Sequence, residues 1–99
     1  MQVRLSNAAE REMEDIGNFI ANDNPLRAVS FVQELVERCH GLADHSKRYP
    51  VITTWRGLQI RRCPYRHYLI FYVLDERGLE IAHIIHGSRD YLTLLFRED

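Results

Sequence analysis

The hydrophobic periodicity of this chain changes once along its length, and that change sets the order of its elements. Between residues 7 and 42, apolar side chains recur every three or four positions, as they do on one face of an α-helix. From residue 58 onward, the spacing becomes that of a β-strand, whose side chains point alternately to two faces. The pattern therefore predicts helices first and a sheet second, within an α+β fold.

The helical part is divided by the polar sequence NDNP. Asn24 is a natural N-cap, and Pro25 fits the first turn of a helix. Because the link is short, the two helices should form an antiparallel hairpin. The first helix should be capped by Ser6 or Asn7, and Asn7 with Glu10 fits a capping box.

Each predicted helix has one apolar stripe that should face a common core. The stripe of the first helix is Ala9, Met13, Ile16 and Ile20, and that of the second is Ala28, Phe31, Leu35, Cys39 and Leu42. The side chains expected to face away from the first stripe are Glu12, Glu14, Asp15 and Asn18.

Three strands follow the hairpin, in the sequences GLQIRRC, HYLIFYVL and LEIAHIIH. Pro64 should lie in the turn after the first of them, and Gly78 should take a positive φ in the turn after the second. A short strand, QVRLS, precedes the helices, and a short helical tail, RDYLTLLF, closes the chain. The expected fold is thus a short N-terminal strand, an antiparallel helical hairpin, a three-strand antiparallel meander and a short C-terminal helical tail. The length of the chain suits a single domain over residues 1–99.

The meander is apolar on both faces. No position of YLIFYV is charged, and simple alternation in the last strand places Ile81 and Ile85 on one face and Ala82 and Ile84 on the other. A helical hairpin covers one face of a sheet only. We therefore expect an apolar groove on the other face that receives another polypeptide. The alternative is that the tail and residues 46–56 cover it.

Charge is distributed unevenly although the net charge is −1. No acidic residue lies between Asp44 and Asp75, an interval that contains Lys47, Arg48, Arg56, Arg61, Arg62 and Arg66. This interval favours a positive surface directed at an acidic partner or at nucleic acid. The alternative is a solvated basic strand edge that prevents aggregation.

Several classes of protein do not fit the sequence. No stretch has the roughly 18 apolar residues that a membrane helix needs, and the N-terminus lacks a signal-peptide core. Cys39 and Cys63 have no metal-ligand spacing and are expected to be reduced, packed thiols. We therefore expect a cytoplasmic protein without a metal or a cofactor.

Catalytic residues are not assembled by any motif of the sequence. His83 and His86 are three apart in a strand, so they point to opposite faces and cannot form an acid–base pair. Arg61 and Arg62 diverge for the same reason. Arg89 follows a Gly-Ser turn, where its guanidinium is placed to bind a carboxylate or a phosphate. The alternative is a local pair with Asp90, or a pair with acidic residues of the helical hairpin.

Three stretches resemble the RelE/ParE toxin superfamily, and in particular its ParE branch. They are VRLSNAAEREMEDIGNFIANDNPLRAVSFV, GLQIRRCPYRHYLIFYVL and EIAHIIHGSRD, which occur in the family's order and span nearly the whole chain. The resemblance implies a toxin of a type II toxin–antitoxin module that binds DNA gyrase and forms a hetero-oligomer with an antitoxin wrapped across it. It implies no membrane association and no sequence-specific DNA binding by the toxin alone.

The RelE branch, whose members cut messenger RNA on the ribosome, is the alternative. A ribonuclease of that type would use Arg61, His83 and Arg89. The tyrosine that such nucleases carry in the tail would fall near Leu95, and Tyr91 lies one turn too early, so the ParE branch is favoured. The residues expected to bind an antitoxin or a target are Arg61, Arg62, Arg66, Tyr68, Tyr72, Ile81, His83, Ile85, Arg89 and Tyr91.

Overall fold

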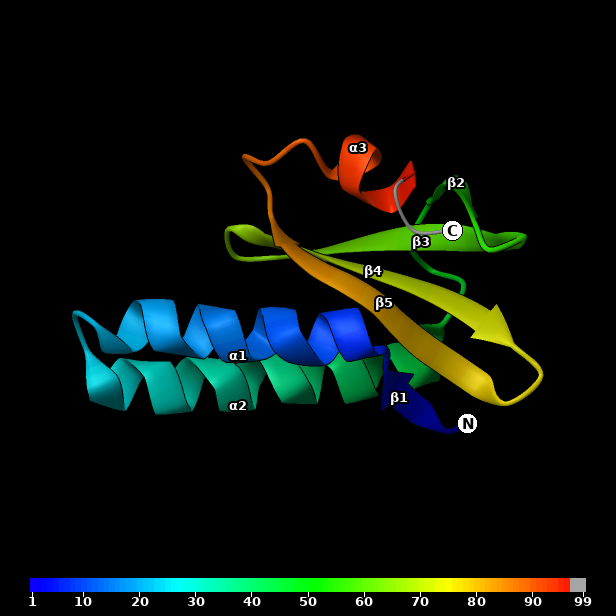
Figure 1. Ribbon diagram of the computed structural model, residues 1–99. Coiled ribbons are helices and arrows are strands. Elements are labelled where there is room, and N and C mark those ends of the chain that lie inside the picture. The colour runs from blue at the N-terminus through cyan, green and yellow to red at the C-terminus, as the bar shows by residue number, and fades with distance from the viewer. Residues whose placement is uncertain (97–99) are drawn as a thin grey trace.

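The element order agrees with the predicted α+β fold. The computed structural model describes residues 1–96. The chain runs through β1 (Val3–Leu5), α1 (Asn7–Ala21), α2 (Pro25–Gly41), the 3₁₀ turn η1 (Leu42–His45), β2 (Val51–Trp55), β3 (Leu58–Tyr65), β4 (Tyr68–Asp75), β5 (Gly78–His86) and α3 (Tyr91–Phe96). The helical hairpin, the antiparallel strands and the short C-terminal helix are therefore confirmed (Figure 1).

The sheet has five strands in the order β1-β5-β4-β3-β2. β1 pairs with β5 in parallel, and all other neighbours are antiparallel. β2 was not predicted, because residues 46–56 were interpreted as a loop. It joins β3 through a tight turn in which Arg56 and Gly57 both have positive φ, 53° and 79°. That left-handed geometry suits a two-residue hairpin.

Pro64 lies within β3 and not in the following turn, so this part of the prediction was wrong. It is paired with Leu69 of β4, and the turn itself is formed by Arg66 and His67. The pairing of β2 with β3 extends only as far as Arg61. Beyond that point β3 is an edge strand, where a residue without a backbone N–H is tolerated.

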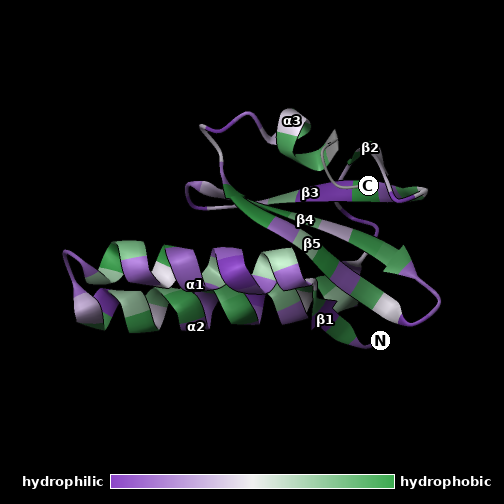
Figure 2. Cartoon of the chain, in the orientation of Figure 1, coloured by the Kyte–Doolittle hydropathy of each residue, from purple (hydrophilic) through white to green (hydrophobic). Residues whose placement is uncertain are grey.

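The molecule has three layers, with α1 and α2 on one face of the sheet and α3 on the other (Figure 1). We name these faces the hairpin face and the tail face. Hydrophobic residues run along β4 and β5 in the middle layer (Figure 2). The buried core of the hairpin face is Ala9, Met13, Ile16, Phe31, Leu35, Cys39, Leu42, Cys63, Ile70, Tyr72, Leu79, Ile81 and Ile84. The buried core of the tail face is Trp55, Ile60, Phe71, Val73, Ala82, Ile85 and Leu95.

A β-bulge in β5 alters which side chains share a face. Phe71 pairs with His83 and Tyr72 pairs with Ile81, so Ala82 is an extra residue on β5. Ala82 therefore lies on the tail face, as His83 does. The predicted grouping of Ile81 with Ile85 was wrong, because alternation changes phase at the bulge.

The tail face is covered, so the predicted apolar groove on it does not exist. Leu95 of α3 and Trp55 of β2 are both buried against it, and Tyr91 packs on Phe71 with ring centroids 5.1 Å apart. The alternative interpretation, in which the tail and residues 46–56 cover this face, is the one that the structure supports. A surface for a polypeptide partner must therefore be sought elsewhere on the molecule.

Both helix N-caps are formed by side chains. Ser6, not Asn7, caps α1, and its Oγ accepts a hydrogen bond from Ala9 N at 3.0 Å. Asn24 caps α2 as predicted, by accepting a hydrogen bond from Arg27 N at 3.0 Å. The Ser6 hydroxyl also donates to Ala82 O at 2.7 Å, which ties the start of α1 to β5.

Candidate partner-binding groove

An uncovered groove lies between α1 and the C-terminal half of β5. It consists of three adjoining hollows with volumes of about 410, 160 and 600 Å³. The first and second share Phe19, Tyr68 and His86, and the second and third share Glu12, Asp15 and Arg89. We name it the α1–β5 groove. The remaining lining residues are Ala8, Arg11, Glu14, Ile16, Ile20, Arg27, Phe31, Arg66, His67, His83, Ile84, Ile85 and Leu94.

The groove follows from the shortness of β1. β1 pairs only with Leu79–Ile81, so β5 has an open backbone edge from Ala82 onward. α1 starts at this point and passes beside the open edge. Its Glu12 Oε1 accepts a hydrogen bond from Ile84 N at 2.8 Å. A side chain of α1 thus takes the place of a neighbouring strand at Ile84, and residues of α1 and β5 line the hollow between them.

Glu12 was predicted to face solvent, and this was wrong. Its second oxygen, Oε2, lies 2.9 Å from His83 Nδ1, and its side chain is half-buried. His83 itself is only 4% exposed, and its ring meets that of Trp55 edge to face. The bulge turns His83 toward the tail face, which no regular alternation would reveal. The pair joins α1 to β5 at the centre of the groove.

The apolar part of the groove centres on Phe19. This side chain is 72% exposed, although it is a large hydrophobic residue at the mouth of two hollows. Tyr68 and Phe31 form the wall behind it, with ring centroids 5.7 Å apart. Sequence reasoning missed Phe19. The available signal was an aromatic residue beside the acidic residues of α1, outside the stripe that packs on the sheet.

The rim of the groove is basic at the end that α2 and the β3–β4 turn line. Arg27 and Arg66 lie beside its apolar part, and Arg89 lies where the second and third hollows meet. Arg27 pairs with Glu34, at 2.8 Å between Nη1 and Oε2. Arg66 lies 4.0 Å from the same carboxylate, whereas no carboxylate of residues 1–96 lies within 4.0 Å of Arg89.

His86 is held locally at the end of β5. Its Nδ1 accepts a hydrogen bond from Ser88 N at 3.1 Å, and the Ser88 Oγ lies 2.8 Å from the same nitrogen. Its ring stacks on His67 with a centroid distance of 6.2 Å. This arrangement gives the turn before Arg89 a fixed shape and places two imidazoles on the rim.

Five of the ten predicted binding residues line the groove, and the other five lie elsewhere. The five in the groove are Arg66, Tyr68, His83, Ile85 and Arg89. Tyr72 and Ile81 are 0% exposed in the core of the hairpin face, so their prediction as surface residues was wrong. Burial raises the pKa of Tyr72 to about 12, and its hydroxyl donates to Ser46 O at 2.8 Å.

The two predicted arginines of β3 are engaged within the fold. Arg61 Nη1 donates to Tyr49 O at 2.6 Å and to Lys47 O at 3.1 Å. Arg62 Nη1 donates to Tyr91 Oη at 2.8 Å on the tail face. Neither arginine lines the α1–β5 groove, and their binding of an antitoxin or a target stays a prediction.

The set of residues that a ribonuclease would need is not assembled. Arg61 pairs with Tyr72, whose side chain lies in the hairpin-face core, while His83 pairs with Phe71 of the tail face. Arg61 and His83 therefore lie on opposite faces of the sheet. His83 and Arg89 do line one hollow, together with Arg11 and Glu12.

Metal and membrane features were also sought in the described part of the chain. Within residues 1–96, no group of three or more potential His, Cys, Asp or Glu ligands is placed to hold a metal ion. None of the helices described has the length and apolar character needed to cross a membrane. Cys39 and Cys63 are both free and buried, and burial raises the pKa of Cys39 to about 12.

Comparison with known proteins agrees with this fold. A chain from the solved structure "Chromosomal ParDE TA system from P. aeruginosa" matches with a TM-score of 0.72 and 14% sequence identity, over 89% of this chain and 97% of that chain. Comparison with curated proteins gives no significant match. The family model "ParE toxin of type II toxin-antitoxin system, parDE" matches residues 3–91. The chain therefore belongs to the ParE toxin family of type II toxin–antitoxin systems.

Proposed function

We propose that this protein is a toxin whose antitoxin neutralises it by occupying the α1–β5 groove, and whose target is DNA gyrase. The observation that carries the proposal is Phe19, which is exposed in an apolar hollow between α1 and the β3–β4 turn. An exposed aromatic residue at the mouth of an apolar hollow is a typical anchor for a protein partner. Membership of the ParE family supplies the partner class, an antitoxin.

The groove also indicates the chemistry of the antitoxin segment. The floor of the groove is apolar at the end that α2 and the β3–β4 turn line, and Arg66 and Arg89 lie on the rim. A segment with one or two large apolar side chains flanked by carboxylates would fill the hollow and pair with the rim. Its carboxylates would approach Arg89 first, since that side chain has no carboxylate partner among residues 1–96.

Replacement of Phe19 by serine tests this proposal. We expect Phe19→Ser to weaken antitoxin binding by at least about tenfold, the effect of losing a central aromatic anchor, with little change in stability. Leu26→Ser is the matched control, because Leu26 is 85% exposed on α2 outside the groove. Calorimetric titration with the co-encoded antitoxin gives both affinities. Equal affinity of wild type and Phe19→Ser would place the antitoxin elsewhere.

Gyrase as the target follows from the family and is tested separately. We expect the purified toxin to inhibit gyrase supercoiling and to stabilise cleaved DNA complexes, and the antitoxin to reverse both effects. Gyrase acts in the cytoplasm, and we place the toxin there as well. We propose that the toxin forms a hetero-oligomer with its antitoxin. The toxin alone is not expected to recognise a DNA sequence. Unchanged supercoiling at saturating toxin would exclude this target.

A ribosome-dependent ribonuclease is the alternative, and it keeps one supporting observation. His83, Arg89 and Glu12 line a single hollow, which offers an imidazole, a cation and a carboxylate. Toeprinting of translating ribosomes distinguishes the two functions. Cuts in the ribosomal A site would favour the nuclease, and their absence together with inhibited supercoiling would favour gyrase.

A further inference from the structure

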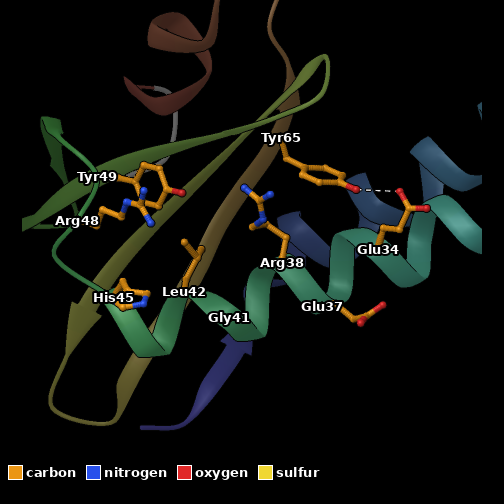
Figure 3. A pocket seen from close by; sticks show the side chains of 9 residues that line it. All are labelled: Glu34, Glu37, Arg38, Gly41, Leu42, His45, Arg48, Tyr49 and Tyr65. Atoms are coloured by element: carbon orange, nitrogen blue, oxygen red, sulfur yellow. Dashed lines mark hydrogen bonds between the residues drawn. The ribbon is translucent and has the colours of Figure 1, made fainter.

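A second cleft lies between the C-terminal half of α2, the loop after η1 and β3, and it is separate from the α1–β5 groove. Its volume is about 610 Å³, within the range of small-molecule sites. Figure 3 shows its lining residues, which are Glu34, Glu37, Arg38, Gly41, Leu42, His45, Arg48, Tyr49 and Tyr65. We name it the α2–β3 cleft.

Arg38 projects into this cleft without a carboxylate partner. Glu34 is four residues before it on α2, the spacing at which a glutamate and an arginine usually pair. Glu34 is instead engaged by Tyr65 Oη, which donates to its Oε1 at 2.8 Å, and by Arg27. The Arg38 guanidinium lies over the Tyr65 ring at 4.8 Å, and no carboxylate of residues 1–96 lies within 4.0 Å of it.

Figure 3 shows the Arg38 side chain directed into the space between Tyr49 and Tyr65, while Glu37 points away. Arg38 is half-buried, so its charge is partly removed from water. A guanidinium in that position gains most from an anion that approaches through the open mouth of the cleft.

Arg48 brings a second positive charge to the same cleft, and His45 also lines it. Arg48 lies beside the Tyr49 ring, 5.9 Å from its centroid, and it likewise has no ion-pair partner among residues 1–96. His45 and Arg48 lie shortly after Asp44, at the start of the sequence interval that contains no acidic residue. The cleft therefore combines two arginines, an imidazole and two aromatic rings with two carboxylates, of which Glu34 is engaged by Tyr65 and Arg27 and Glu37 points away (Figure 3).

We propose that the α2–β3 cleft binds a phosphate group, carried by a nucleotide or by a nucleic acid. Arg38 Nη1 donates to Cys63 Sγ at 3.9 Å, and neither Arg38 nor Arg48 is paired with a carboxylate among residues 1–96. Two such guanidinium groups match the charge and the several acceptor oxygens of a phosphate, whereas one carboxylate uses a single fork. The tyrosines supply flat surfaces beside the phosphate for the apolar part of the ligand. The α2–β3 cleft shares no lining residue with the α1–β5 groove.

Titration with phosphate ligands tests the assignment. The probes are inorganic phosphate, AMP, a short single-stranded RNA and, for comparison, a glutamate-rich peptide, each added to the ¹⁵N-labelled full chain at low salt. We expect saturable shifts of the Arg38 and Arg48 side-chain Nε–H signals with phosphate ligands. Equal affinity for AMP and RNA would indicate a nucleotide source, and much tighter RNA binding a nucleic-acid source.

Variants separate the cleft from a diffuse basic surface. We expect Arg38→Gln and Arg48→Gln each to weaken AMP or RNA binding by at least about tenfold. Lys47→Gln is the matched control, since Lys47 is adjacent in sequence but does not line the cleft; it should change affinity by less than about twofold. Arg48 is exposed, so its variant should retain the fold even if Arg38→Gln does not.

Three outcomes would overturn the proposal. They are the absence of saturable binding by every phosphate probe, an equal loss of affinity in Lys47→Gln and Arg48→Gln, and tighter binding of the glutamate-rich peptide than of the phosphate ligands at Arg38 and Arg48. The last outcome would assign the cleft to an acidic polypeptide.

Discussion

At the scale of single residues, the contacts that tie α1 to the sheet involve side chains near the β5 bulge. Glu12 accepts from Ile84 N and contacts His83 Nδ1 with its two oxygens. β1 pairs with β5 only as far as Ile81, so the outer edge of β5 at Ile84 has no strand neighbour and the carboxylate supplies the missing acceptor. One glutamate on a largely polar helix face thus has a structural role that its sequence position does not reveal.

Removal of the Glu12 carboxylate should destabilise the protein. We expect Glu12→Ala to lower the free energy of unfolding by about 1–3 kcal/mol, since the Ile84 N–H loses its acceptor. Urea unfolding followed by circular dichroism measures the change. Glu14→Ala is the control, because Glu14 is an exposed residue of the same helix, and it should change stability by less than about 0.5 kcal/mol. A similar effect of both variants would contradict this role.

Acid should also weaken the fold through Asp75. The hydrogen bond and charge of Arg4 lower the pKa of Asp75, so its ionised form stabilises the folded state. This contribution is complete above the unfolded-state pKa of about 4, and it is lost as pH falls through the lower folded-state pKa. We expect Arg4→Gln to show a smaller loss of stability than wild type between about pH 5 and pH 3. Unfolding midpoints of wild type and Arg4→Gln at the two pH values measure these losses of stability. Equal losses in the two proteins would refute the linkage between Arg4 and Asp75.

At the scale of elements, β1 depends on a close backbone approach at Gly78. The φ of Gly78 is +128°, and a Cβ built there would lie 2.3 Å from Gln2 O. The same oxygen accepts a hydrogen bond from Leu79 N at 2.8 Å. Only glycine allows the β4–β5 turn and β1 to meet in this way.

Gly78→Ala should therefore detach β1. We expect a loss of about 2 kcal/mol or more, because both the backbone angle and the contact with Gln2 are unfavourable for alanine. Amide exchange at Leu79 and Ser6, which report on this edge, should accelerate more than exchange in β3 and β4. Gly41→Ala has no atom within 4 Å of its new Cβ and should be nearly neutral. Unchanged exchange at Leu79 would contradict the predicted detachment.

The elements that the sequence predicted correctly are those with a strong local signal. The two helices, Asn24 as a cap and the strands β3 to β5 follow from periodicity and turn residues. β2 was missed although its sequence, VITTW, consists of β-branched and aromatic residues that favour strands; as a five-residue edge strand it shows little alternation of apolar and polar side chains. The predicted residues that line the groove are Arg66, Tyr68, His83, Ile85 and Arg89. The wall of the groove on α1 arises from the bulge and from the short β1. Neither feature has a sequence pattern of its own, so Phe19 and Glu12 were missed.

At the scale of the whole molecule, the sheet separates two cores of unequal size. The tail-face core is closed by α3, which contributes the buried Leu95 and the ring of Tyr91. Arg62 holds that ring in place through its hydrogen bond to Tyr91 Oη. The second face of the sheet is therefore sheltered by a helix of six residues near the end of the chain.

Truncation of Leu95 tests the importance of this short helix. We expect Leu95→Ala to cost about 2–4 kcal/mol, because Leu95 is 2% exposed and its removal leaves a cavity over Phe71 and Ile85. Leu92→Ala, at a position that is 44% exposed, should cost less than about 0.5 kcal/mol. Thermal unfolding of the two variants compares them directly. Equal melting temperatures would show that α3 contributes little to the fold.

The parallel pairing of β1 with β5 has a consequence for synthesis of the chain. Of the five strands, β1 is the first to leave the ribosome and β5 is the last. This edge of the sheet cannot close until β5 has been translated, because the whole helical hairpin and three strands separate β1 from β5 in the sequence. The α1–β5 groove also has walls from segments that are far apart in the sequence. A nascent chain therefore has no groove until β5 has emerged and packed beside α1.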